Sequence, residues 1–143
     1  MAAFFGNQFF WLPVLAWAIG QLLKVATDSW GERHLSLRSL GMSGGMPSSH
    51  TAMTVCLATV IARRVGPGSP LFAGVAILTV VVIYDATGVR RAAGQQGIIL
   101  NQVLEDLRQH LGLRYQRLRQ FIGHTPVEVL AGIALGIVVG LLG

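Results

Sequence analysis

The sequence predicts an all-α integral membrane protein: a helical bundle of about four transmembrane helices plus an amphipathic interfacial helix. Of its 143 residues, 52% are hydrophobic and only 12% are charged, and the mean hydropathy is +0.59. Soluble domains carry about 25% charged residues, so this composition is typical of a membrane protein. The length suits one membrane-embedded domain over residues 1–143.

Four apolar stretches come near the roughly 20 residues that a membrane-spanning helix needs. They run from about Phe9 to Val25, Ser49 to Ala62, Pro70 to Val89 and Pro126 to Gly143. The second stretch is short and could instead form a deep, partly re-entrant helix. No Lys or Arg precedes Lys24, so the first stretch lacks the basic region of a signal peptide and should remain as a helix.

A polar segment with helical periodicity follows the third stretch. Its apolar residues recur every three or four positions, with charged and amide residues between them: Ile99, Val103, Leu104, Leu107 and Leu111. This pattern fits a helix lying on the membrane surface. An ordinary solvated helix packed on the loop side fits it equally well.

The basic residues are unevenly distributed across the predicted membrane. If all four stretches span, nine of the eleven Lys and Arg residues fall on the side of the first and third loops. The positive-inside rule places that side in the cytoplasm, with the chain in the plasma or inner membrane. The net charge of +5 therefore indicates topology and an anionic ligand rather than nucleic-acid binding, because no basic tail or charge run is present.

Three small residues repeat along the fourth stretch: Gly132, Gly136 and Gly140. This spacing allows close helix contact, either within one chain or in a homo-oligomer. The sequence has no HExxH motif, no cysteine cluster and no Asp-rich loop, so we expect neither a metal nor another cofactor.

Two histidines stand where predicted helices begin, on the same side of the membrane. His50 closes the segment GGMPSSH, and His124 lies in GHTPVE. A helix start offers unpaired N–H groups and the positive end of a dipole, which together favour a bound anion. Ser48 or Ser49 is a good N-cap, and Gly45 lets the backbone approach a ligand, so these three are candidate phosphate-binding residues.

Glu128 follows His124 by four residues, so the two share a helix face. A carboxylate there can accept a hydrogen bond from one ring nitrogen and leave the other as a nucleophile or base. A purely structural His–Glu contact is the alternative.

The third stretch ends in YDATGVRR, which places an ionisable residue at the edge of the membrane. Asp85 is a supporting site candidate that we expect to pair with Arg90, Arg91 or Lys24, in either a structural or a functional ion pair. The two arginines are suited to holding phosphate oxygens, and Lys24 ends the first stretch on the same side. Topology-setting charges or snorkelling are the simpler interpretations.

The segments SGGMPSSH, YDATGVRRAAG and GHTPVEV, in this order, resemble the divergent branch of the type-2 phosphatidic acid phosphatase superfamily, which is related to acid phosphatases and vanadium-dependent haloperoxidases. PSSH looks like the superfamily's Pro-Ser-Gly-His motif, with Ser49 in place of glycine. The resemblance implies that His50 is the general acid and that Ser48 binds phosphate. It further implies that His124 is the nucleophile and that Glu128, in place of Asp, orients it.

Two motif positions depart from the superfamily pattern. No Arg-Pro follows Lys24, and Leu118 stands where the third motif has an arginine. The neighbouring Arg117 and Arg119, or the distant Arg90 and Arg91, would have to supply that charge. The wider superfamily also has a six-helix core, against about four spans here.

Together, the residues and the resemblance predict a metal-independent membrane phosphatase that hydrolyses a lipid phosphate or pyrophosphate through a phosphohistidine. Its partner would be a phosphorylated membrane lipid, and its site would face the cytoplasm. The alternatives are a non-catalytic membrane protein that binds phospholipid head groups at the same site, and a helix-packing assembly partner that uses the glycine stripe.

Overall fold

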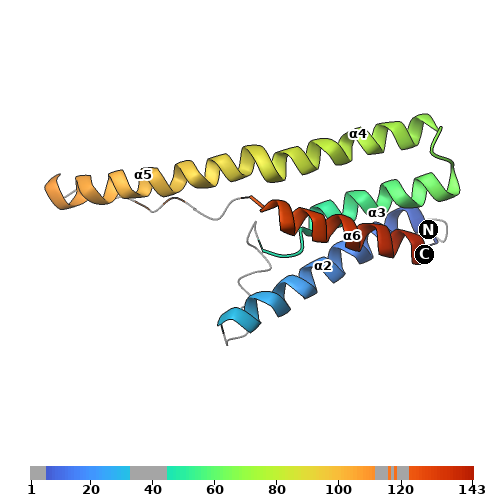
Figure 1. Cartoon of the computed structure of the whole chain (residues 1–143), viewed down its shortest axis with the longest axis horizontal. Coiled ribbons are helices and arrows are strands. Elements are labelled where there is room, and N and C mark those ends of the chain that lie inside the picture. The colour runs from blue at the N-terminus through green and yellow to red at the C-terminus, as the bar shows by residue number, and fades with distance from the viewer. Residues whose placement is uncertain (1–5, 33–44, 112–115, 117, 119–122) are drawn as a thin grey trace.

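The computed structural model describes residues 6–32, 45–111, 116, 118 and 123–143. Within these residues every regular element is helical, which confirms the all-α prediction for this part of the chain. The elements are α2 (Gln8–Glu32), α3 (Ser49–Arg64), α4 (Pro70–Tyr84), the π-helical turn η2 (Asp85–Val89), α5 (Arg90–Leu111) and α6 (Pro126–Leu142). Helix α3 is central and contacts α2, α4 and α6 (Figure 1).

The glycine stripe of α6 packs against α3 in the same chain, with the two helices parallel. A Cβ atom on Gly132 would lie 2.5 Å from the carbonyl oxygen of Ser48, and one on Gly136 would lie 2.5 Å from that of Ala52. One further turn along α6, a Cβ atom on Gly140 would lie 2.8 Å from the Cβ of Thr59. Of the two interpretations of the stripe, packing within the chain is therefore the one that the structure uses, and α3 occupies this face.

Substitution of Gly136 by alanine should destabilise the bundle. The added methyl group has no room, and overpacking of this kind costs about 1–3 kcal/mol, more than the about 0.5–1 kcal/mol that alanine gains over glycine within a helix. The matched control is Gly74→Ala in α4, where nothing lies within 4 Å of an added Cβ. Thermal unfolding in detergent should show a lower midpoint for the Gly136 variant alone. Equal midpoints for the two variants would contradict the close contact.

Two arginines hold the other end of the α3–α6 pair. Arg63 Nη1 donates to the carbonyl oxygens of Gly140 and Leu141, at 2.9 and 2.7 Å, and Arg64 Nη2 donates to that of Gly143, at 2.8 Å. These bonds satisfy carbonyl groups that the end of a helix leaves unpaired, and they set positive charge against the negative end of its dipole. The parallel alignment of α3 and α6 is thus fixed at both ends.

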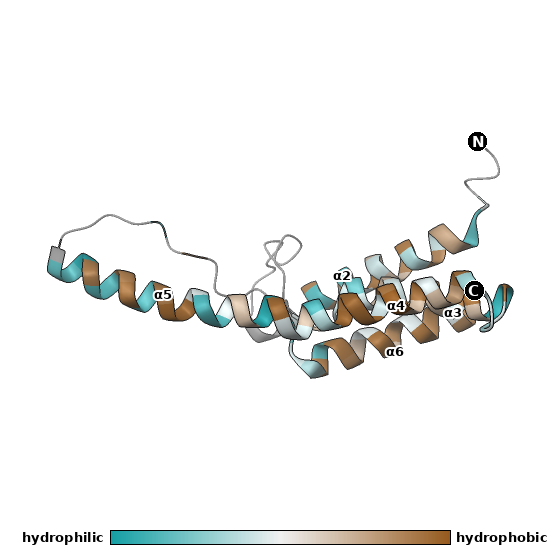
Figure 2. Ribbon diagram, turned by 90° about the horizontal axis from the view of Figure 1, so that it is seen from above, coloured by the Kyte–Doolittle hydropathy of each residue, from teal (hydrophilic) through white to brown (hydrophobic). Residues whose placement is uncertain are grey.

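Helices α4 and α5 form one continuous rod through η2, and α5 extends far beyond the bundle (Figure 1). The predicted third stretch ends at Val89, where η2 ends, but the amphipathic helix that follows is collinear with it rather than a separate element. Figure 2 shows the change in character, with α4 largely hydrophobic and α5 alternating between hydrophobic and hydrophilic residues.

Two segments are long and apolar enough to cross a membrane, Gln8–Thr27 and Pro70–His110, and Pro126–Leu142 is a shorter apolar helix. The predicted count of four spans is therefore not confirmed, since α3 has only 16 residues. The outer faces nevertheless carry large exposed apolar side chains, among them Leu22, Ile77 and Leu130, each more than 60% exposed. Surfaces of this kind are expected where lipid, not water, is the solvent.

Candidate active site

The predicted site residues gather at one end of the bundle, where α3 and α6 begin. The backbone N–H of Ser48 donates to the carbonyl oxygen of Glu128, at 3.0 Å, so the two helix starts are joined directly. Lys24 on α2 is 5% exposed and lies against Gly45, where an added Cβ would be 2.8 Å from the lysine Cε. The positive ends of two helix dipoles and one lysine thus share a small region.

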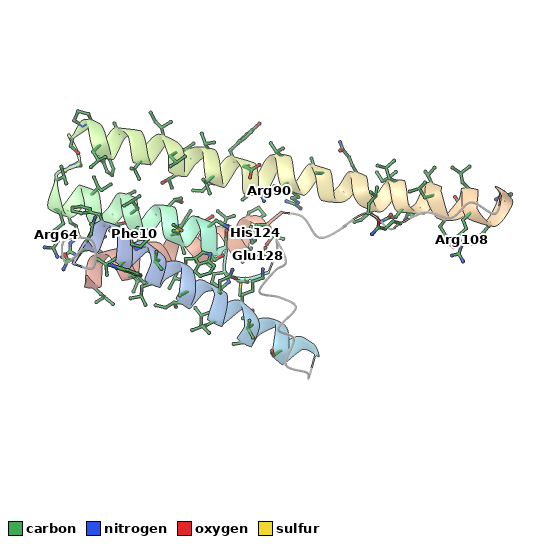
Figure 3. All side chains as sticks on the ribbon, turned by 180° about the vertical axis from the view of Figure 1, so that it is seen from behind. Phe10, Arg64, Arg90, Arg108, His124 and Glu128 are labelled. Atoms are coloured by element: carbon green, nitrogen blue, oxygen red, sulfur yellow. The ribbon has the colours of Figure 1, made fainter. Side chains whose placement is uncertain are left out.

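His124 and Glu128 form the predicted pair. Nδ1 of His124 lies 2.8 Å from Oε2 of Glu128, and His124 is 9% exposed. An ionised carboxylate can only accept, so Nδ1 is the donor of this bond and Nε2 is the ring nitrogen that the carboxylate does not engage. The same carboxylate oxygen accepts from the N–H of Thr125, at 3.2 Å, as part of a capping box that starts α6. Figure 3 shows both side chains beside Arg90, with Arg64 at the opposite end of the bundle.

The chain leading into α6 is docked on the long rod. The N–H of His124 donates to the carbonyl oxygen of Ala86 in η2, at 2.9 Å. Gly123 has φ +115° and touches the backbone of the rod so closely that a Cβ would lie 2.5 Å from the nitrogen of Arg91. Only glycine combines this conformation with this contact. The nucleophile candidate is therefore positioned from two sides, by Glu128 and by the rod.

The π-helical turn brings Asp85 and Arg90 together. In a regular α-helix, residues five apart point in directions about 140° apart, so this pair would not form. In η2 the N–H of Arg90 donates to the carbonyl oxygen of Asp85, the wider i→i+5 bond, and the Arg90 Nε donates to the Asp85 carboxylate. Of the three partners predicted for Asp85, the structure selects Arg90. The sequence pattern carried no sign of the wide turn itself.

His50 lies in the first turn of α3, with its side chain exposed, outside the two segments long enough to span. Desolvation by the surrounding protein disfavours the charged ring and lowers the pKa of His50 most. The positive charges of Arg90, His124 and Lys24 lower it further. These three groups therefore lie within electrostatic range of the His50 ring. The four cationic or potentially cationic side chains come from α2, α3, α5 and the segment that leads into α6.

A bound anion should reverse this shift. Negative charge beside an imidazolium favours its protonated form, so inorganic phosphate or vanadate should raise the pKa of His50 from below its usual 6.5, and binding should take up a proton. An NMR titration of the histidine C–H signals, with and without phosphate, measures this. The signal of His110, at the far end of α5, should not respond. A His50 titration indifferent to phosphate would mean that no anion binds beside it.

Ser48 and Ser49, predicted as phosphate ligands, are almost fully buried at this helix start. Oγ of Ser48 is bonded to Oγ1 of Thr51, at 2.9 Å, and it makes no capping bond. Ser49 packs against Gly20 of α2. These side chains serve the contacts among α2, α3 and α6, whereas the side chain of the neighbouring His50 is exposed.

The superfamily's arginine position lies away from this cluster. Both backbone groups of Leu118 bond to the side chain of Asn101 on α5, at 2.9 Å each. Asn101 is ten residues beyond Arg91, about 15 Å along the helix at 1.5 Å per residue. Arg117 and Arg119, the alternative sources of charge, lie outside the described residues. Among the described arginines, Arg90 is the one whose charge lowers the pKa of His50.

Arg91 contributes its backbone to the contact with Gly123, and its side chain is exposed. Within the residues that the structure describes, no group of three or more His, Cys, Asp and Glu side chains could hold a metal ion.

The fold and this cluster define a helical membrane protein with two histidines, a lysine and an arginine at one end of its bundle. Residues 5–139 match the divergent PAP2 family, and the chain belongs to it. A relative in Bacillus subtilis (strain 168), named as the uncharacterized membrane protein YuiD, is 35% identical over 133 residues, which covers 85% of this chain and 84% of the relative. No solved structure matches the chain. The predicted family resemblance is confirmed.

Proposed function

We propose that this protein is a membrane phosphatase that hydrolyses a lipid phosphate or pyrophosphate through a phosphohistidine intermediate. The observation that carries the proposal is the bond of 2.8 Å between His124 Nδ1 and Glu128 Oε2, in a ring whose Nε2 is left available. The second histidine, His50, lies within electrostatic range of His124, Arg90 and Lys24. Nucleophile, orienting carboxylate and acid are the parts that phosphoryl transfer through histidine requires.

In the first step, the lone pair of His124 Nε2 attacks phosphorus, and the bond from phosphorus to the lipid oxygen breaks. The imidazolium of His50 gives its proton to the departing oxygen, which leaves as an alcohol or a phosphate. The Glu128 carboxylate stabilises the positive charge that develops on the His124 ring. A bound phosphate would first raise the proton affinity of His50, so the acid would be charged when it is needed.

In the second step, water attacks the phosphohistidine. Neutral His50 accepts the proton of that water, the P–N bond breaks, and inorganic phosphate leaves with both rings restored. Catalysis of this kind depends mainly on positioning and on charge stabilisation. Arg90, Lys24 and the two helix starts would supply the positive field, in place of the arginine missing at Leu118.

The charge distribution supports a site that opens to the cytoplasm, with the lipid chain remaining in the bilayer. A cysteine introduced at Gly68, in the exposed loop at the other end of the bundle, tests this orientation. It should react with an impermeant maleimide added to intact cells. Labelling only after lysis would reverse the orientation.

The function itself is tested with the full chain purified in detergent. Phosphate release should be measured from phosphatidic acid, phosphatidylglycerol phosphate and a prenyl pyrophosphate, for the wild type and for His50→Ala. His110→Ala is the matched control, because this histidine lies on α5 and bonds to the carbonyl oxygen of Asp106, outside the cluster. We expect the wild type to release phosphate from at least one substrate. The His50 variant should lose this activity, and the His110 variant should keep it. Binding of these lipids without release would favour a head-group receptor.

A further inference from the structure

Asn101 makes a contact that the proposed reaction does not use. Helix α5 is mostly exposed, yet Asn101 is only 6% exposed. Its Nδ2 donates to the carbonyl oxygen of Leu118, and its Oδ1 accepts from the N–H of the same residue, both at 2.9 Å. One side chain thus satisfies both backbone groups of a residue 17 positions away. Gly94 and Gly97, also buried, lie on the same side of the helix.

Three attachments in a row join the chain before α6 to the rod. Asn101 holds Leu118, the backbone of Arg91 touches Gly123, and the carbonyl oxygen of Ala86 accepts from the N–H of His124. The three contacts follow one another in order: those nearer to η2 on the rod involve residues nearer to His124 in the sequence. Of the three contacts, the bonds of Asn101 lie farthest from η2 along the rod. They join α5 to Leu118, which belongs to no helix, so they do not connect two helices of the bundle.

We propose that Asn101 is a positioning residue for His124. It fixes Leu118, six residues before His124, to the same rod that carries Arg90. A nucleophile misplaced by about 1 Å can lose roughly 100-fold in rate, so an anchor remote from the chemistry can control it. The inference rests on the proposed function for its kinetic consequence, but its structural consequence can be measured alone.

Three variants of the full chain in detergent test this role. Asn101→Leu keeps the approximate shape and removes both bonds, Asn101→Asp keeps the acceptor for the Leu118 N–H, and Gln102→Ala changes an exposed neighbour. We expect kcat to fall at least about tenfold for the leucine variant, with KM within about twofold, and less for the aspartate variant. The thermal midpoint should stay near that of the wild type, because the bundle keeps its contacts. If Asn101→Leu lowered the thermal midpoint and weakened substrate binding together with kcat, Asn101 would be a merely structural residue.

A spectroscopic arm separates this inference from the phosphatase proposal. In protein labelled with 15N-histidine, the ring signals of His124, assigned with His124→Gln, should broaden or shift in Asn101→Leu, while those of His110 stay in place. This result would support the positioning role even if no lipid phosphate were hydrolysed. Unchanged His124 signals together with unchanged kcat would overturn it.

Discussion

Replacing His124 by alanine is expected to slow phosphate release by roughly four orders of magnitude or more, because the attacking nitrogen is lost and water must replace it. Glu128→Gln should cost roughly 100-fold, since an amide keeps the shape but removes the charge that stabilises the imidazolium. The bundle should survive both changes, because the glycine contacts between α3 and α6 and the backbone bond from Ser48 to Glu128 use neither of the two side chains.

The measurement is a quench experiment with a 32P-labelled lipid phosphate. A phosphohistidine is stable in alkali and labile in acid, and the label should map to the peptide that contains His124. Glu128→Gln should still become labelled, more slowly, and His110→Ala should match the wild type. Turnover without any label on histidine, or a fully active His124→Ala variant, would rule out the proposed intermediate.

Arg90→Gln is expected to produce the second largest loss, roughly 100-fold to 1000-fold in kcat/KM, because preorganised positive charge at a phosphoryl group is worth several kcal/mol. Asp85→Asn should act in the opposite direction on anion binding. The Asp85 carboxylate is bonded to the guanidinium that a phosphate would use, so its neutralisation removes a competitor. Inhibition by inorganic phosphate or vanadate should therefore weaken in the first variant and strengthen in the second.

Stability separates this role from a structural ion pair. The two side chains are 51% and 40% exposed, and exposed pairs contribute about 0–1 kcal/mol. Both variants should therefore unfold within a few degrees of the wild type. Parallel losses of stability, with anion binding unchanged, would show that the pair serves only the fold.

Part of the candidate site could be predicted because His124 and Glu128 lie only four residues apart in the sequence. The spacing of His124 and Glu128 fixes a shared helix face, and a proline at the first helical position marks where α6 begins. The convergence of the two histidine segments followed from counting membrane crossings, which places loops one and three on one side. The structure has both helix starts at one end of the bundle.

Other features depend on contacts that a periodic pattern does not contain. The glycine stripe fits a neighbour in the same chain as well as one in another chain, and only the position of α3 decides between them. Burial of Ser48 and Ser49 likewise depends on α2 and α6 packing over the start of α3. The role of Asn101 requires a partner 17 residues away, for which the sequence offers only an amide on a helix.

The count of spans shows a different limit. Hydropathy identified the apolar stretches, but α3, with 16 residues, is short for a span, and the third stretch continues into α5 without a break. The helix continues through the wide turn of η2, so no loop residue marks the transition from apolar to amphipathic sequence.

The wide turn at η2 also sets the phase of everything that follows it. Each residue of an α-helix advances the chain by about 100° around the axis. If the same residues formed a regular α-helix instead of η2, α5 would be rotated by about that angle relative to α4. Arg90 and Asn101 would then turn together away from their partners, although no loop had changed length. The wide turn thus determines which side of the rod faces the histidines.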